Sequence, residues 1–253
     1  ELNCQLVERM GSGIKLTEAG ENFLPHALEI MDAVRGASSA VDDSNPNALK
    51  GTLKIGIIPT IAPYFLPDMM EDLYPGEPEL DIYVEEQQTD NLLNRLKMGE
   101  VDHLLLSPPI PDKGMTVEQV GSEPFYLAVS KEEPLADRNQ ISLDEINDEP
   151  ILLLEEGHCL RDQSLSFCQQ NNVTPNVVFQ GSSLHSILNL VETGFGYTFV
   201  PDMVRKSQHR DSLEFIPFTE PQPKRDIILV RRSSTRMNKL DKRFRDLVKN
   251  WFK

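Results

Sequence analysis

The feature that most constrains this chain is a regular alternation of strand-like and helix-like segments between residues 51 and 232. Short apolar runs such as LKIGIIP, DHLLLS, PILLLEE and DIILVRR have the length of buried strands. The other strand candidates are DIYVEEQ, FYLAVS, VVFQG and YTFVP, and the helix candidates are YFLPDMMEDLY, NLLNRLKMG, HCLRDQSLSFCQQ and SSLHSILNLVETG. This alternation predicts an α/β fold with mostly parallel sheets.

The alternation occurs twice, over about residues 51–125 and 126–226, which suggests two α/β subdomains. A last amphipathic stretch, MNKLDKRFRDLVKNWF, predicts a C-terminal helix with one apolar face: Leu240, Phe244, Leu247, Val248 and Trp251. Ligands of open α/β sheets bind at the carboxyl ends of strands and often between domains. We therefore look for a site between the two subdomains.

The first 50 residues have a different character. GSGIKLT resembles a small hairpin, after which Thr17 can cap a helix that has Glu18 and Glu21 in its first turn. An apolar stripe at helical spacing extends this helix to about Ala40: Phe23, Leu24, Ala27, Leu28, Met31 and Val34. Pro25 predicts a kink or a late start. The stripe packs either on its own domain or on a second copy, and the sequence leaves both open. DDSNPNALKG, residues 42–51, reads as a linker.

Composition narrows the class of protein. The formal net charge of −15 argues against a nucleic-acid surface on this stretch, because phosphate contacts need Lys and Arg. The chain begins with glutamate in the middle of a pattern, so we expect an N-terminal segment to be missing. Three cysteines are too few for a secreted disulfide scaffold, which favours a reducing cytoplasm. No run approaches the roughly 18 apolar residues of a membrane span, and no secretion leader is visible.

Polar side chains follow several predicted strands. They are Thr60 after LKIGIIP, Thr89 after DIYVEEQQ, His158 and Cys159 after PILLLEEG, and Ser182 and Ser183 after VVFQG. Each precedes a helix-like run, so each can offer a hydroxyl or a backbone N–H at a helix start. Plain N-capping is the commoner use of such Ser and Thr residues. Convergence on one cleft is what would make them a site.

Cys159 has a more specific setting. It lies in the first turn of a predicted helix, next to His158 and two residues before Arg161. A helix N-terminus and a nearby cation both favour the thiolate, which is the form that attacks peroxides and disulfides. The competing interpretation is a small buried hydrophobic residue, which describes most free cysteines.

Cys168 follows Cys159 by nine residues, with no helix breaker between them. A helix rises about 1.5 Å per residue and turns about 100°, so the two Cα atoms would lie about 13 Å apart on nearly opposite faces. A disulfide needs them within about 7 Å. If the two cysteines join, the segment must unwind, and the pair could then couple an oxidation state to a change of shape.

Other chemistries have weaker support. There is no Cys-x-x-Cys pair, and the adjacent His158 and Cys159 are poorly placed to point at one zinc ion. The chain contains no G-x-S-x-G, no G-x-G-x-x-G and no P-loop, so we predict neither a serine hydrolase nor a nucleotide site.

Several stretches resemble one known family. LVERMGSGIKLTEAG resembles the wing and the start of the linker helix in LysR-type transcriptional regulators, and KGTLKIGIIPTIAPYFLP resembles the opening of their effector-binding domain. EPFYLAVSKEEPLA and LVETGFGYTFVP are similar to two further landmarks. EEGHCLRDQSLSFC resembles the redox segment of the peroxide-sensing members. The resemblance covers essentially the whole chain.

The resemblance implies a role for each residue that matches the peroxide-sensing members. Cys159 matches the peroxide-reacting cysteine, and Cys168 matches its disulfide partner. Thr60, Thr89 and His158 match residues that hold peroxide and shape the pocket. Arg161 and Asp162 lie in the same matched segment, and Arg225 in QPKRD matches an arginine linked to reactivity. Cys4 matches no functional cysteine.

The resemblance also implies an architecture with two subdomains like those of periplasmic binding proteins. The corresponding ranges are 1–16 for the end of a winged helix-turn-helix domain, 17–46 for the linker helix and linker, 47–125 with 227–253 for subdomain I, and 126–226 for subdomain II. The C-terminal helix should return to subdomain I. Dimers and tetramers of the family favour pairing of the linker helix with a second copy.

The implied function is a cytoplasmic transcriptional activator that hydrogen peroxide oxidises, and not an enzyme. Its implied partners are promoter DNA, bound through the largely missing N-terminal domain, and RNA polymerase, with no cofactor, metal or membrane. Two alternatives stay open: a regulator of the same fold that senses a small organic ligand, and a cysteine-based peroxidase. The wing-like segment argues against the peroxidase, and the paired cysteines argue against the small-ligand sensor.

Overall fold

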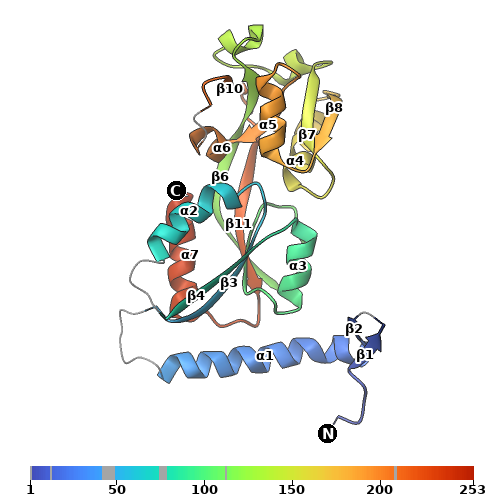
Figure 1. Ribbon diagram of the computed structural model, residues 1–253, viewed down its shortest axis with the longest axis vertical. Coiled ribbons are helices and arrows are strands. Elements are labelled where there is room, and N and C mark those ends of the chain that lie inside the picture. The colour runs from blue at the N-terminus through green and yellow to red at the C-terminus, as the bar shows by residue number, and fades with distance from the viewer. Residues whose placement is uncertain (1, 12, 42–48, 74–78, 112, 208–209) are drawn as a thin grey trace.

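The N-terminal hairpin and helix lie across one end of an elongated molecule, and two α/β subdomains follow along its length (Figure 1). The computed structural model describes residues 2–11, 13–41, 49–73, 79–111, 113–207 and 210–253. The predicted linker falls mostly on residues 42–48, which lie outside the described residues. Within the described ranges, no helix combines the length and the apolar character needed to cross a membrane.

The hairpin pairs β1 (Val7–Met10) with β2 (Gly13–Leu16), and α1 (Glu18–Val41) follows directly. The Thr17 hydroxyl accepts a hydrogen bond from the Gly20 N–H at 3.0 Å and donates to the Gln5 carbonyl at 2.6 Å. The predicted cap is therefore confirmed, and it also ties the helix to the hairpin. The late start is wrong, because the helix begins at Glu18 and continues through Pro25.

Contacts of α1 with the rest of the chain are partly polar. The Asp32 carboxylate is buried, and it lies 3.5 Å from the Arg232 guanidinium and accepts the Thr235 hydroxyl at 3.0 Å. Ile30 and Met31 keep 60% and 51% of their surface exposed. The helix thus packs on subdomain I and still presents apolar side chains to solvent, which leaves pairing with a second copy as a proposal.

In subdomain I three strands of the sheet run parallel, with β3 hydrogen-bonded to β4 on one side and to β5 on the other. Its elements are β3 (Gly51–Ile57), α2 (Ala62–Leu73), β4 (Leu80–Glu86), α3 (Thr89–Lys97) and β5 (His103–Leu106). Alternating apolar positions of β3 and the fully buried β5 fill the core between the helices.

Two long strands join the subdomains: β6 (Met115–Ser130) and β11 (Lys224–Arg232). They pair antiparallel up to Pro124, and from Phe125 onward β6 pairs with β9 and β10 instead. In Figure 1 both strands run side by side at the junction between the two subdomains. The change of partner between Pro124 and Phe125 lies one residue before the boundary predicted between residues 125 and 126, and the subdomain ranges stay a prediction.

Subdomain II contains a short parallel pair, β7 and β8, next to the strands that pair with β6. Its elements are two 3-10 turns (Pro134–Asp137 and Leu143–Ile146), β7 (Pro150–Leu154), α4 (Cys159–Gln170), β8 (Asn176–Gly181), α5 (Leu184–Glu192), β9 (Thr198–Pro201), α6 (Asp202–Ser207) and β10 (Leu213–Pro217).

The α/β class with two subdomains is confirmed, but the prediction of mostly parallel sheets is wrong. Strands β3, β4 and β5 run parallel, as do β7 and β8, whereas every pairing of β6 and β11 with a neighbour is antiparallel. The chain leaves subdomain I through β6 and comes back through β11, and adjacent strands that carry the chain out and back must run in opposite directions.

The C-terminal helix α7 (Lys239–Trp251) packs against subdomain I, as predicted. Leu240, Phe244, Leu247 and Val248 are buried in the same core as β3 and β5. The Trp251 indole N–H donates to the Asp68 carboxylate of α2 at 2.7 Å, and the His103 ring contacts the Asp241 carboxylate at 2.8 Å. Apolar burial and these two polar contacts hold the C-terminal helix on subdomain I.

We expect Phe244→Ala to lower the free energy of unfolding by about 3–5 kcal/mol, because the lost ring leaves a cavity under α7. Urea unfolding followed by circular dichroism measures the change. Arg243→Ala, at the exposed neighbouring position, is the control and should stay within about 0.5 kcal/mol of the unaltered chain. Equal stabilities for both variants would contradict the packing of α7.

Candidate functional site

A buried arginine lies at the junction of the two subdomains. Arg225, near the start of β11, is 2% exposed. Its Nη1 donates to the Thr60 hydroxyl at 2.8 Å, and its Nη2 donates to the Thr60 carbonyl at 3.1 Å. Thr60 follows β3 and is itself buried. Two of the predicted site residues, 165 positions apart in the chain, are thus in direct contact.

Glu123 and Met203 complete the surroundings of this arginine, and sequence reasoning missed both. The Glu123 carboxylate accepts the Arg225 Nε–H at 2.9 Å, and Arg225 Nη2 lies 3.6 Å from the Met203 sulfur. The only signal for Glu123 was a carboxylate at the start of the strand candidate in EPFYLAVS. Its partner could not be identified because the register between β6 and β11 is set by tertiary structure.

Cys159 is the first residue of α4, it is half-buried, and it packs against the larger hydrophobic core, which spans both subdomains. Burial raises the pKa of its thiol, while the nearby Arg225 guanidinium and the hydrogen bond of the Leu160 N–H act in the opposite direction. The helix start and a cation thus act on the thiol in the predicted direction, but desolvation outweighs both, so the pKa of the Cys159 thiol is raised.

The cation that acts on Cys159 is Arg225 and not the predicted Arg161. The Arg161 guanidinium pairs with the Asp162 carboxylate at 3.0 Å, and Asp162 is mostly exposed. Asp162 itself raises the pKa of the Cys159 thiol. Both residues therefore lie on α4 close to Cys159; Asp162 is on the solvent side of the helix, whereas Arg161 is partly buried.

His158 precedes Cys159 at the N-cap position of α4 and is 6% exposed. Burial lowers the pKa of its ring, and the Glu155 carboxylate offsets this only in part. The imidazole is therefore neutral near pH 7. A neutral ring offers one donor and one acceptor nitrogen.

Thr89 begins α3 on the other side of the junction. Its hydroxyl oxygen is buried and has no hydrogen-bond partner within the described ranges. The adjacent Gln88 amide lies 3.5 Å from the Glu156 carbonyl, so the start of α3 faces the loop that leads into α4. Gly157 has φ +95°, a conformation that favours glycine, and a Cβ there would lie 2.5 Å from the Gln88 side-chain oxygen.

Cys168 lies in a different environment from Cys159. It is fully buried in the smaller core, which is confined to subdomain II and includes Leu153, Phe199 and Phe218. Helix α4 is continuous from Cys159 to Gln170, and both thiols are free. The predicted separation by a helix is confirmed, and the two sulfurs face two different hydrophobic cores.

We expect Cys168 in the folded chain to resist iodoacetamide at pH 8. Burial raises the pKa of its thiol to about 11, well above the ordinary value. Because burial favours the protonated thiol, it stabilises the folded chain fully at any pH below the thiol pKa of the unfolded chain. This stabilisation is lost as the pH rises from that value through about 11, the pKa in the folded chain. Alkylation over a pH series with peptide mass mapping measures how far folding protects Cys168 from iodoacetamide, and the urea-unfolded chain is the control. Equal labelling of folded and unfolded chain at pH 8 would contradict it.

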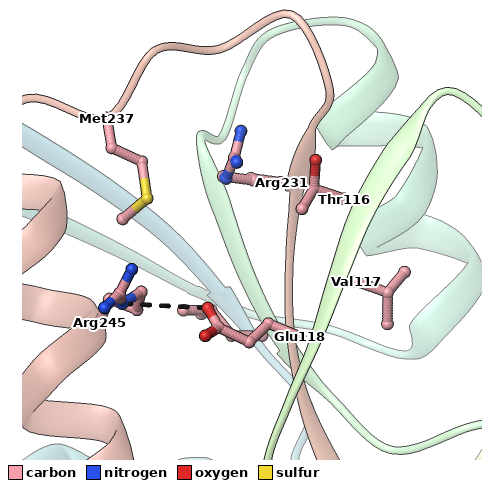
Figure 2. Close-up of a pocket in the computed structure, with 7 residues that line it drawn as sticks. Thr116, Val117, Glu118, Arg231, Met237 and Arg245 are labelled. Atoms are coloured by element: carbon pink, nitrogen blue, oxygen red, sulfur yellow. Dashed lines mark ion pairs between the residues drawn. The ribbon is translucent and has the colours of Figure 1, made fainter.

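A separate pocket of about 300 Å³ lies on subdomain I between β6, β11 and α7. Figure 2 shows Met237, Arg245 and Glu118 around it, with the Arg245 guanidinium 3.9 Å from the Glu118 carboxylate. None of the predicted site residues lines this pocket. Its Glu118 carboxylate pairs with Arg245, and its Arg231 guanidinium donates to the Arg232 and Thr235 carbonyls. Within the described ranges, no three His, Cys, Asp or Glu side chains lie close enough to hold a metal ion.

Comparison with known proteins identifies the family of the chain. Residues 46–253 match the family model of the LysR substrate binding domain. The chain is 33% identical over 92% of its length to a hydrogen peroxide-inducible genes activator of Dickeya chrysanthemi, and it spans 76% of that protein.

Solved structures of OxyR proteins are similar over nearly the whole chain. A full-length OxyR cysteine variant from Pseudomonas aeruginosa has a TM-score of 0.81 at 29% identity, covering 97% of this chain and 78% of that one. A hydrogen-peroxide-bound OxyR cysteine variant from Corynebacterium glutamicum has a TM-score of 0.75 at 31% identity, covering 98% and 79%. The chain therefore belongs to the LysR family, and residues 46–253 form its substrate-binding domain.

Proposed function

We propose that this chain is a peroxide-sensing, DNA-binding transcriptional regulator in which Cys159 reacts with hydrogen peroxide and Cys168 completes a disulfide. The observation that carries the proposal is the position of Cys159 at the start of α4, within the influence of the buried Arg225, while Cys168 is held at the other end of the same helix. The relatives named for hydrogen peroxide support the choice of oxidant.

The first step is a two-electron oxidation of sulfur. The Cys159 thiolate attacks one peroxide oxygen, the O–O bond breaks, and the departing hydroxide takes a proton to become water. The buried Thr89 hydroxyl and the neutral His158 ring can orient the peroxide, and Arg225, fixed on Thr60, stabilises the negative charge on sulfur and on the departing oxygen. Burial keeps the resting thiol protonated, so only the minor thiolate form reacts.

The second step joins the two sulfurs. The Cys168 sulfur attacks the sulfenic sulfur of Cys159, the S–O bond breaks, and a second water forms with the thiol proton. A continuous helix holds the Cα atoms about 13 Å apart, beyond the roughly 7 Å that a disulfide allows. The α4 segment must therefore unwind, and Cys168 must leave the smaller core.

Unwinding of α4 would also break hydrogen bonds between α4 and subdomain I. The Gln163 side-chain amide donates to the Ser107 hydroxyl at 2.8 Å and to the Pro108 carbonyl at 2.7 Å, both of which follow β5. Loss of these bonds changes the surface near the subdomain junction. We propose that this changes how copies of the chain pair, in part through the exposed face of α1. The new oligomer geometry then changes binding to promoter DNA and to RNA polymerase. The setting is the cytoplasm, where cellular reductants can return the disulfide to thiols.

The test is oxidation of the full chain with about one molar equivalent of hydrogen peroxide. We expect the loss of two thiols and a cross-linked peptide that joins residues 159 and 168, together with loss of helical signal from α4. Thiol titration, peptide mass mapping and circular dichroism measure the three effects. Fluorescence anisotropy of promoter DNA, with the complete DNA-binding domain present, tests the regulatory step.

Other outcomes would favour the alternatives. Thiols that survive this dose, with binding of a small organic anion instead, would indicate a small-ligand regulator. Turnover of many peroxide equivalents in the presence of a thiol reductant would indicate a peroxidase. Each result overturns the peroxide-sensing proposal.

A further inference from the structure

Glu123 is a buried carboxylate at the point where β6 leaves subdomain I. It is 8% exposed, and both of its oxygens are used. Oε1 accepts the Arg225 Nε–H at 2.9 Å, and Oε2 accepts the Met203 backbone N–H at 2.8 Å. One carboxylate thus connects β11, which carries Arg225, with the start of α6 in subdomain II.

The bond to Nε fixes the direction of the whole Arg225 side chain. A guanidinium is planar, so anchoring Nε on one side sets where Nη1 and Nη2 point on the other. Both of these nitrogens donate to Thr60 in subdomain I. Glu123 provides the one carboxylate among the described hydrogen-bond partners of Arg225, and Arg225 is the cation that acts on Cys159.

We propose that Glu123 is a positioning residue for the peroxide reaction: it holds the Arg225 guanidinium toward Cys159 while it fastens that arginine to α6. The inference rests on the proposed function and adds a residue to it. Glu123 does not touch the reacting atoms and acts through Arg225. Because Thr60 belongs to subdomain I and Met203 to subdomain II, the same contacts make the charge on Cys159 depend on how the two subdomains meet.

Two simpler roles for Glu123 predict different results. If Glu123 only neutralised Arg225, its removal would leave more positive charge near Cys159, and the thiol would ionise at lower pH. If Glu123 only supported the Met203 N–H, its removal would change stability and leave the pH dependence of Cys159 alone. The positioning role predicts that a buried guanidinium without its carboxylate turns away, so that Cys159 ionises at higher pH.

The test uses the full chain carrying Cys4→Ser, so that only Cys159 and Cys168 remain. Glu123→Gln keeps the shape of the side chain and removes its charge. We expect the pH midpoint for iodoacetamide alkylation of Cys159, mapped by peptide mass, to move upward by about one pH unit. The rate of 159–168 disulfide formation with hydrogen peroxide at pH 7 should fall about tenfold, because the thiolate fraction falls by that factor.

Glu118→Gln is the matched control. Glu118 lies on the same strand but pairs at the surface with Lys249, and it does not contact Arg225. This variant should keep the alkylation midpoint and the oxidation rate of its parent. If Glu123→Gln does not fold, Glu123→Asp replaces it, since a carboxylate drawn back by one methylene should shift both readouts in the same direction by a smaller factor.

An unchanged or lowered alkylation midpoint in a folded Glu123 variant would overturn the positioning role. The alkylation arm does not involve peroxide, so it stands apart from the proposed function. If the parent chain forms no 159–168 disulfide with peroxide, the sensing proposal fails by itself. If the parent forms it and the Glu123 variants do so at the parent rate, only the inference about Glu123 fails.

Discussion

Cys159→Ser is expected to leave the chain without any response to hydrogen peroxide. A serine hydroxyl is not oxidised by peroxide. Two cysteines remain: Cys4, which is exposed and lies outside α4, and Cys168, which is fully buried with a thiol pKa raised to about 11. At pH 7 only about one molecule in ten thousand then carries the Cys168 thiolate, so it cannot replace Cys159 as the reacting group. We expect thiol loss at one equivalent of peroxide to slow by at least about a hundredfold, measured by quenched thiol titration.

Two further variants separate the role of Cys159 from those of the other two cysteines. Cys4→Ser should oxidise like the unaltered chain, because Cys4 is exposed and lies in the N-terminal segment outside α4. Cys168→Ser should react once and stop at a sulfenic acid, which dimedone traps, while α4 keeps its helical signal. Normal peroxide oxidation of the Cys159→Ser chain would remove the basis of the proposed function.

Arg225→Met is expected to weaken both the fold and the chemistry. Removal of one partner from a buried ion pair leaves the Glu123 carboxylate without its cation, which costs about 3–5 kcal/mol of unfolding free energy. The Cys159 thiol also loses the charge that opposes desolvation, so its pKa rises further and oxidation at pH 7 slows by about tenfold or more. Urea unfolding and the rate of disulfide formation measure the two effects.

The double variant Arg225→Met with Glu123→Met separates the two effects. Replacing both members of a buried pair by apolar side chains of similar size is often close to neutral for stability. We therefore expect the double variant to recover most of the unfolding free energy but none of the oxidation rate. Recovery of both would assign Arg225 a purely structural role.

The elements that position Cys159 could be predicted from the sequence because their signals are local. Apolar runs with the length of buried strands predicted β3 and β7, and the absence of helix breakers from HCLRDQSLSFCQQ predicted α4 from Cys159 to Gln170. The Thr17 cap also depends only on nearby groups. In each case, the deciding interaction lies within about one helical turn or one strand of the residue concerned.

The features that could not be predicted from the sequence depend on residues that lie far apart in the chain. The six residues of α6 make fewer than two helical turns, too few for a helical period to be recognised, and the five-residue β10 was also missed. The direction of β6 relative to β11, and with it the Glu123–Arg225 pair, follows from a chain that returns 102 positions later. Burial of Cys159 likewise comes from packing against a core that spans both subdomains, and its effect on the thiol pKa outweighs the helix start and the cation, the two local signals.

The antiparallel pair of β6 and β11 limits how the two subdomains can move. Both strands are hydrogen-bonded from Arg232 opposite Met115 to Lys224 opposite Pro124, so the subdomains are joined by a continuous ribbon and not by two independent tethers. A rotation of one subdomain against the other must then be absorbed as torsion of that ribbon. Its register slips between Ile227 and Ile228, and such an irregularity is where a paired strand bends and twists most readily. A turn of one subdomain about the length of this ribbon can therefore take place with the β-ladder kept intact.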